Sequence, residues 1–270
     1  MMWKWETEQQ PKGVIVMIHG AMEHHGRYGW LIEMWRRNGF HVVMGDLPGQ
    51  GMTSRAQRGH ISSFNEYIDE VKDWIQAAYQ FDLPLFILGH SMGGLVAIRL
   101  LQEMEVETAG VILSSPCLGM IHTPPKIMDI LSHGLNSLSP SVKFSSGLTV
   151  DMATRNEEVR QADKEDALYV NKVSVRWYRE LLQAIKTADL KAGEVPDVPL
   201  LIMQAGHDLI VDKKTVRKWF HRLDLSEMHY KEWPGLYHEI FNEPEREEVF
   251  HYAKGFVENR LRLLGYVIEE

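Results

Sequence analysis

The chain has 270 residues, of which 44% are apolar, and this allows one large α/β domain or two small ones with a sizeable core. Its net charge of −8 excludes a nucleic-acid surface and charge-driven docking on anionic lipid, which leaves only transient membrane contact. The single cysteine, Cys117, cannot form an internal disulfide. We find no signal-peptide core and no apolar run of about 20 residues, and therefore expect a cytoplasmic protein without a transmembrane segment.

Short apolar runs alternate with amphipathic stretches along most of the chain. The run from Gly13 to Ile18 is apolar throughout, as expected of a strand buried on both faces of a sheet. Ser63 and Glu66 have the spacing of a capping box at the start of a helix expected over 64–79. Further strands are expected at 40–44, 85–88, 111–113, 200–203 and 228–233, and further helices at 27–37, 213–221 and 245–264. This alternation predicts an α/β fold with a mostly parallel central sheet flanked by helices.

One stretch interrupts the alternation. Residues 118–192 contain helical patterns but no convincing strand, and such an insert is too long for a plain connection. We interpret it as a helical cap over the carboxyl edge of the sheet, between core segments 1–117 and 193–270; the alternative is extra packing on the outside of the sheet. Four apolar positions of this cap are candidate substrate contacts: Ile127, Ile130, Leu131 and Leu135.

The segment Gly89-His90-Ser91-Met92-Gly93 lies between the apolar run 84–88 and the helix-forming stretch 94–101. Strand, tight turn and helix with a serine at the apex form the nucleophile elbow G-x-S-x-G. Such a turn strains the serine backbone, so its neighbours two positions away must be very small, and glycines meet that demand. Ser91 is the predicted nucleophile.

A serine hydroxyl needs a base to take its proton and an acid to orient that base. In an elbow-type sheet the partners follow in the order serine, acid, histidine, each just after a late strand. Asp208 follows the expected strand 200–203 and is the predicted acid; Asp212 has the position of a helix N-cap, and Asp197 precedes the strand. His238 follows the last expected strand and is the predicted base. Five competitors are excluded because they lie beside the acid, beside the serine or within predicted helices or strands: His207, His90, His221, His229 and His251.

An oxyanion needs two backbone N–H donors near the serine. One is expected from Met92, directly after the nucleophile, and the second from Ala21, which follows the strand end at His19-Gly20. His90 adjoins the nucleophile, and we assign it to packing or to the substrate-binding surface.

Two other features suggest chemistry less strongly. Residues 46–54 carry two glycines and a proline, but they lack the Gly-Lys-Ser/Thr of a P-loop and the spacing of a dinucleotide fingerprint. We interpret this loop as structural support beside the pocket. The pair His24-His25 belongs to no HExxH or Cys–His cluster, so we predict no metal and no cofactor.

Five segments together resemble the α/β-hydrolase superfamily and, within it, the monoacylglycerol lipase and lysophospholipase group, including phospholipases of the Bacillus type. They are His19-Gly20-Ala21-Met22-Glu23-His24-His25-Gly26-Arg27-Tyr28, the 46–54 loop, Gly89 to Gly94, Gly206 to Val211 and Tyr237-His238-Glu239. The resemblance covers essentially the whole chain. It implies a triad of Ser91, Asp208 and His238, oxyanion donors at Ala21 and Met92, and a role for Glu23 and Arg27 in shaping the oxyanion loop.

The resemblance implies two-step hydrolysis of lipid esters through an acyl-enzyme, with a small-molecule lipid as the partner. An aminopeptidase or amidase on the same scaffold is one alternative, which would need an acidic pocket. The acidic residues of the insert look instead like a solvated helical face: Glu157, Glu158, Asp163, Glu165 and Asp166. A non-catalytic small-molecule receptor is the other alternative, and the complete set of three catalytic residue types argues against it.

Overall fold

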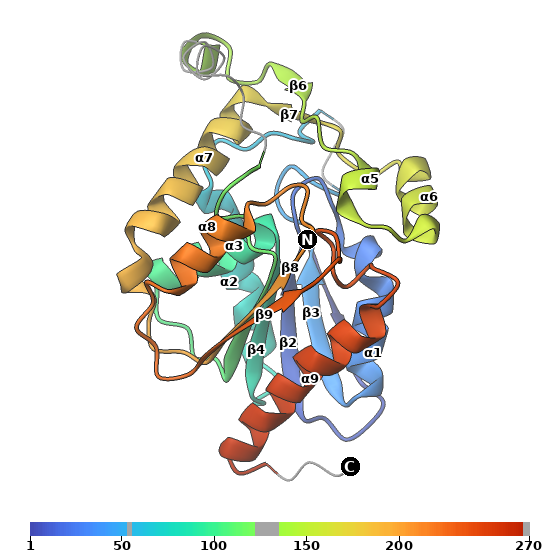
Figure 1. Cartoon of the computed structure of the whole chain (residues 1–270), viewed down its shortest axis with the longest axis vertical. Coiled ribbons are helices and arrows are strands. Elements are labelled where there is room, and N and C mark those ends of the chain that lie inside the picture. The colour runs from blue at the N-terminus through green and yellow to red at the C-terminus, as the bar shows by residue number, and fades with distance from the viewer. Residues whose placement is uncertain (53–55, 122–134, 267–270) are drawn as a thin grey trace.

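The computed structural model describes residues 1–52, 56–121 and 135–266. Its centre is a seven-stranded sheet in the order β1-β3-β2-β4-β5-β8-β9 (Figure 1), parallel throughout except where β1 pairs with β3. The strands are β1 (Met2–Trp5), β2 (Gly13–Ile18), β3 (Phe40–Gly45), β4 (Leu85–His90), β5 (Gly110–Ser114), β8 (Leu200–Ala205) and β9 (Met228–Trp233). Every strand predicted from the sequence is therefore present, and the predicted fold class is confirmed.

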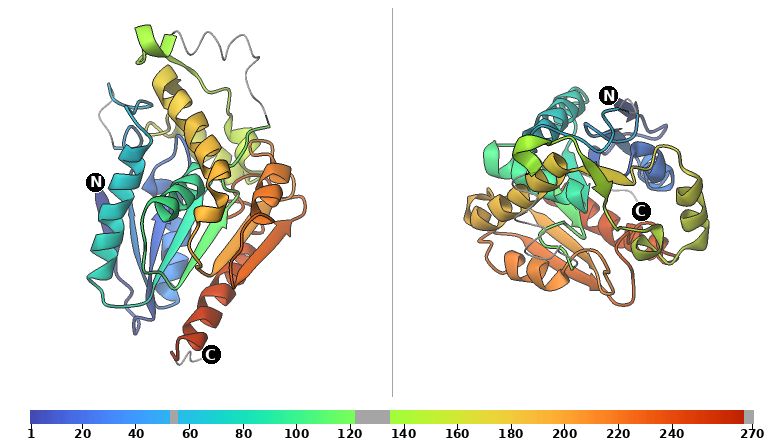
Figure 2. Two further views of the ribbon diagram at one scale, coloured as in Figure 1. Left: turned by 90° about the vertical axis from the view of Figure 1, so that its left-hand side faces the viewer. Right: turned by 90° about the horizontal axis from the view of Figure 1, so that it is seen from above.

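Helices cover both faces of the sheet (Figure 2). One face carries α1 and α9, and the other carries α2, α3 and α8. The helical elements outside the insert are η1 (His25–Tyr28), α1 (Gly29–Arg37), α2 (Asn65–Tyr79), α3 (Met92–Glu103), η2 (Ala192–Glu194), α8 (Lys213–Phe220) and α9 (Arg246–Leu263).

The apolar strands explain why the sheet has two cores. Successive side chains of a strand point to opposite faces. In β2, Val14, Val16 and Ile18 pack under α2 and α3, whereas Ile15 and Met17 pack under α1 and α9. Both sets are fully buried, which is why the run contains no polar residue.

Two features were not predicted. The antiparallel edge strand β1 is only four residues long and half exposed, so it has no apolar run to reveal it. Within the insert, β6 (Lys143–Ser145) and β7 (Lys172–Ser174) form a small antiparallel sheet where no strand was expected. Each is three residues long, which is too short for a periodic signal.

The described part of the insert also contains α5 (Val150–Ala153), α6 (Glu157–Glu165) and α7 (Val175–Leu190). The sheet β6–β7 and helices α5 and α6 lie beyond the carboxyl ends of the central strands (Figure 1). Helix α7 runs back along α3, and its buried Trp177 and Leu181 join the same core as α2 and α3. Candidate contacts Ile127, Ile130 and Leu131 lie outside the described residues.

In the β4–α3 turn, we expect Gly93 to be intolerant of any larger side chain. A Cβ on Gly93 would lie 2.1 Å from the backbone oxygen of Ile18. Ile18 cannot shift easily, because its strand β2 is paired with a strand on either side. We expect Gly93→Ala to lower the free energy of unfolding by about 3 kcal/mol, the upper range for overpacking. Urea melts would measure it.

Gly255 provides the matched control, because it lies in α9 with open space around its Cα. Gly255→Ala should stabilise the protein by about 0.5–1 kcal/mol through helix propensity. Equal melting curves for the two variants would contradict the close approach at Gly93.

Candidate active site

Ser91 lies at the junction of β4 and α3 with φ 52° and ψ −117°, a conformation that L-residues rarely adopt. Its N–H donates to the carbonyl of Ser114 at 2.8 Å, and its own carbonyl accepts from the Cys117 N–H at 2.9 Å. These bonds fix the strained backbone from both sides. The strain is the feature that the flanking glycines predicted.

The structure brings the three predicted catalytic residues together from three separate strand ends. The Nε2 atom of His238 lies 2.8 Å from the hydroxyl of Ser91, and its Nδ1 atom lies 2.9 Å from a carboxylate oxygen of Asp208. A carboxylate only accepts, so Nδ1 carries the proton and Nε2 is free to accept from the serine. This is the tautomer that a general base requires.

Asp208 is positioned by its own loop. Its Oδ1 atom accepts from the N–H groups of Ile210 and Val211 at 2.9 and 2.8 Å, and Oδ2 accepts from the Gln204 amide at 3.0 Å. Burial favours the neutral acid, but the His238 charge and these hydrogen bonds outweigh it and lower the pKa of Asp208. The competing Asp212 caps α8, as its sequence position predicted.

The pKa of His238 is shifted in the opposite direction to that of Asp208. Burial disfavours the charged ring, yet the adjacent Asp208 carboxylate outweighs this cost and raises the pKa of His238 above its ordinary value of 6.5. The ring therefore becomes a better base than a free imidazole, and the cation it forms on taking a proton is stabilised.

Both predicted oxyanion donors border Ser91. Met92 begins α3, so its N–H has no acceptor within the helix and points toward the turn. Ala21 lines the same cavity as Ser91. The loop before Ala21 is held by Glu23, whose carboxylate accepts from the Gly20 N–H at 3.0 Å and from the Tyr28 hydroxyl at 2.6 Å.

A single buried cation, Arg27, connects this loop to two distant segments. Its guanidinium lies 3.0 Å from Glu23, binds both oxygens of Glu239 at 3.0 and 3.1 Å, and forms a two-bond pair with Asp163 of α6. Burial raises the pKa of Glu23 to about 7, whereas Arg27 outweighs burial and lowers that of Glu239 to about 2. One positive charge thus links the predicted oxyanion loop, the loop that carries His238 and the insert.

The placement of Asp163 corrects one expectation. The acids of the insert were expected to form a solvated face, but Asp163 is only 6% exposed and pairs with Arg27. Glu157, Glu158 and Glu165 are exposed as expected. Asp166 is half-buried and bonds the ring of His24. Nothing within α6 distinguishes Asp163, because its partner is 136 residues away.

His90 lies behind the catalytic pair and does not line the cavity. Its Nδ1 pairs with the Ser114 hydroxyl at 3.1 Å, and its ring is tilted against that of His238 with centroids 4.9 Å apart. Burial lowers the pKa of His90 to about 3, so the ring is neutral. This position supports packing behind the base and does not support the substrate contact that we also considered.

A cavity of about 480 Å³ opens onto Ser91. The described residues that line it are mostly apolar and come from both the core and the insert, among them Met22, Met92, Met120, Met152, Trp177 and Leu181. Leu135, a predicted contact, is 38% exposed and is not among the lining residues. The sequence does not identify Trp177 and Leu181 as lining residues, since a helical apolar stripe cannot by itself distinguish a core from a cavity wall.

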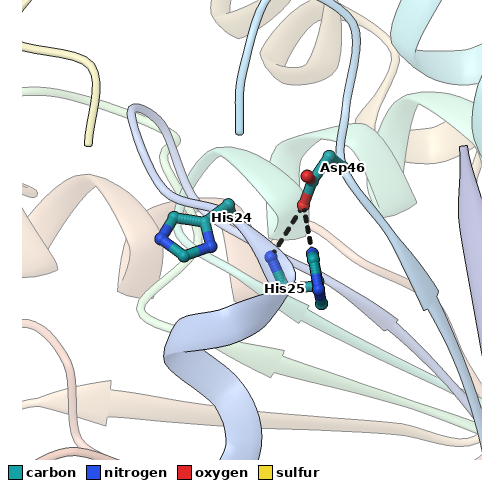
Figure 3. Close-up of side chains that lie close together, drawn as sticks. All are labelled: His24, His25 and Asp46. Carbon is teal, nitrogen blue, oxygen red and sulfur yellow. Dashed lines mark hydrogen bonds and ion pairs between the residues drawn. The ribbon is translucent and has the colours of Figure 1, made fainter. Parts of the chain in front are cut away.

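The atoms of His24, His25 and Asp46 converge near the start of η1 (Figure 3). Asp46 Oδ1 accepts from the N–H of His25 and pairs with its Nδ1, both at 2.8 Å. The Nδ1 of His24 accepts from the Gly26 N–H, and its Nε2 binds Asp166. These contacts fasten the segment that begins at Asp46 to the segment that carries His24 and His25.

A serine on a strained strand-to-helix turn, served by residues from two later strands, is the arrangement that defines the α/β-hydrolase class. The family model Hydrolase_4, described as serine aminopeptidase, S33, matches residues 9–245. The chain belongs to this family.

Relatives with similar sequences span almost the whole chain. Phospholipase YtpA of Bacillus subtilis is 60% identical over 258 residues, covering 95% of this chain and 99% of that protein. Monoacylglycerol lipase of Mycolicibacterium smegmatis is 27% identical over 95% of this chain and 92% of that protein. The crystal structure of Paleococcus ferrophilus monoacylglycerol lipase is 31% identical and superposes with a TM-score of 0.84, covering 97% of this chain and 98% of that one.

The Arg27 cluster predicts a pH-dependent loss of stability. Arg27→Met leaves three carboxylates without their cation, and we expect it to cost about 3–5 kcal/mol at neutral pH. The abandoned acids acquire raised pKa values when folded, so the loss should shrink as pH falls and they take up protons. Denaturant melts between pH 5 and pH 8 would measure both effects.

Arg99→Met is the control for this prediction. Arg99 is also buried, but its ion-pair partner Glu103 is partly exposed and can turn into water. The free energy of unfolding that Arg99→Met loses should be smaller than for Arg27→Met and nearly independent of pH. A pH-independent deficit for Arg27→Met would contradict the buried-charge account.

Proposed function

We propose that this enzyme hydrolyses carboxylic esters of single-chain lipids, such as a monoacylglycerol or a lysophospholipid. The observation that carries the proposal is the contact of the Ser91 hydroxyl with the His238–Asp208 pair at the wall of an apolar cavity. The relatives named phospholipase and monoacylglycerol lipase support the same substrate class.

In the proposed reaction, Ser91 attacks the ester carbonyl while Nε2 of His238 takes the hydroxyl proton. The N–H groups of Ala21 and Met92 stabilise the oxyanion, and each such donor is worth about 3 kcal/mol. His238 then protonates the leaving alcohol, and water activated by the same ring releases the fatty acid. Asp208 holds the tautomer and stabilises the imidazolium. Side chains, backbone N–H groups and water together supply every step, so the proposed mechanism requires no cofactor.

The insert, residues 118–192, serves in this proposal as the cap that encloses the acyl chain. Phe144, Leu148, Met152, Trp177 and Leu181 come from it and line the cavity. Each CH₂ buried there favours binding by about 0.8 kcal/mol. Several lining residues are methionines, whose flexible thioethers adapt to chains of different shape.

An aminopeptidase is the second candidate, because the matching family model carries that description. A free amino terminus needs a carboxylate near the scissile bond. Among the described residues that line the cavity there is no Asp or Glu. Asp163 and Asp166 of the insert are engaged with Arg27 and His24. These contacts favour the ester substrate.

We also propose a cytoplasmic location, supported by the single buried cysteine. Among the described helices none has the length and apolar character required to cross a lipid bilayer. A lipid substrate would then reach the cavity by transient contact with a membrane or micelle.

A substrate panel tests the proposed function. We expect kcat/KM for p-nitrophenyl esters to rise at least about tenfold from the acetyl to the octanoyl chain, since each CH₂ is worth up to about fourfold. Monoacylglycerol and lysophospholipid should be cleaved, and an aminoacyl p-nitroanilide should not. Ser91→Ala should lose at least about 10,000-fold in kcat and all fluorophosphonate labelling. Preference for the anilide would transfer the assignment to an aminopeptidase.

The pKa of His238 predicts the pH dependence. A protonated ring cannot accept the serine proton, so kcat/KM should fall with decreasing pH through an apparent pKa above 6.5, the ordinary value that Asp208 raises. Asp208→Asn removes the raising charge while burial persists, so this limb should move to lower pH as kcat drops about 10,000-fold. An acid limb that stays in place in Asp208→Asn would contradict the proposed pairing.

A further inference from the structure

The loop that carries His238 has no regular secondary structure, yet the base it carries must be placed to within a fraction of an ångström. The loop spans residues 234–245, between β9 and α9. A base on such a loop requires fixed peptide units on either side.

Both neighbours of His238 are anchored through their backbone N–H groups. The Tyr237 N–H donates to Oε2 of Glu243 at 2.9 Å. The Glu239 N–H donates to the carbonyl of Ala153, the last residue of α5, at 2.8 Å. The first anchor is a side chain of the same loop, and the second is the backbone of the insert.

Glu243 is in turn held by the insert. Its side chain is 0% exposed. Oε1 accepts from the Thr154 hydroxyl at 2.7 Å and the Arg155 N–H at 2.5 Å, and Oε2 accepts from Arg155 Nε at 2.6 Å. With Tyr237, four donors converge on one carboxylate. Residues 153–155 therefore support both peptide units that flank the base.

We propose that Glu243 is a positioning residue for His238 and that Arg155 of the insert completes its site. This inference rests on the proposed function. Glu243 does not touch the substrate; it fixes the Tyr237 peptide and so keeps the imidazole in line with Ser91 and Asp208. The insert thereby contributes to the placement of the base as well as to the cavity.

The chemistry of the site distinguishes a carboxylate from its amide. All four partners of Glu243 are donors, and a glutamine would direct an NH₂ group at two of them. Glu243→Gln should lower kcat for p-nitrophenyl octanoate by at least about tenfold, because an ångström of misplacement can cost about 100-fold. KM should stay within about twofold, since the cavity is unchanged.

Arg155→Met is the milder variant. The Arg155 side chain is 35% exposed, so its replacement removes the Nε donor with little disturbance of the core. We expect this substitution to lower kcat by about threefold to tenfold. Arg222→Met is the matched control: Arg222 is 39% exposed, pairs with Asp189 at 2.5 Å, and should retain wild-type kcat and KM.

The readouts separate positioning from mere stability. Kinetics are measured well below each melting temperature, with active sites counted by fluorophosphonate. Proton NMR follows the downfield Nδ1–H signal of His238, which we expect to shift or broaden in Glu243→Gln. A variant that melts earlier but keeps wild-type kcat and an unchanged signal would overturn the inference. If Glu243→Gln does not fold, wild-type kcat in Arg155→Met would overturn it instead.

Assaying the wild-type enzyme alongside the variants distinguishes a failure of the positioning role from a failure of the proposed function. Wild-type cleavage of the ester together with unaffected Glu243→Gln and Arg155→Met variants would remove only the positioning role. A wild-type protein that neither cleaves the ester nor reacts with fluorophosphonate would overturn the proposed function, and the positioning role with it.

Discussion

The close approach of helix α3 to strand β2 is the constraint on which the site depends. Gly93 lies so near the Ile18 carbonyl that no Cβ fits between them. This contact brings the start of α3, with its unpaired N–H groups, against the end of the strand that leads to Ala21. Ser91 then occupies the narrow gap between two sources of backbone donors. A wider separation would move the two donors apart.

Buried charge is the second constraint. Three carboxylates surround Arg27, and isolated charges of this kind are costly in a protein interior. The arrangement is tolerable because Glu23 and Glu239 also accept from neutral or backbone donors, which compensate part of the cost of their burial. As a result, three segments that are far apart in the sequence all bind the same Arg27 guanidinium. Hydrophobic packing alone would not orient polar loops with this directionality, since it has no preferred angle.

The sequence allowed prediction of the sheet and the central chemistry, because both have local signals. Strands buried on both faces are uninterrupted apolar runs, and the elbow is a short motif whose glycines have a steric cause. Asp208 and His238 could be placed by their order after late strands. The partners of Arg27 could not, since Asp163 and Glu239 lie 136 and 212 residues away and no sequence pattern links either of them to Arg27. The three-residue strands β6 and β7 are too short for periodicity. Trp177 shows that an apolar stripe leaves open whether it faces a core or a cavity.

The insert combines two kinds of surface that meet different physical demands. Its β6 and α7 segments present Phe144, Trp177 and Leu181 to the cavity, where contacts are apolar and non-directional. Its α5 and α6 helices and Arg155 between them present backbone groups and charges to the loops that carry Arg27 and His238, where contacts are directional. Apolar walls tolerate exchange of one hydrophobic side chain for another of similar size. Directional polar contacts do not, because a lost partner leaves a buried group unsatisfied. Under the proposed function, changes in the first surface therefore alter which acyl chains fit, whereas changes in the second alter the rate for every substrate.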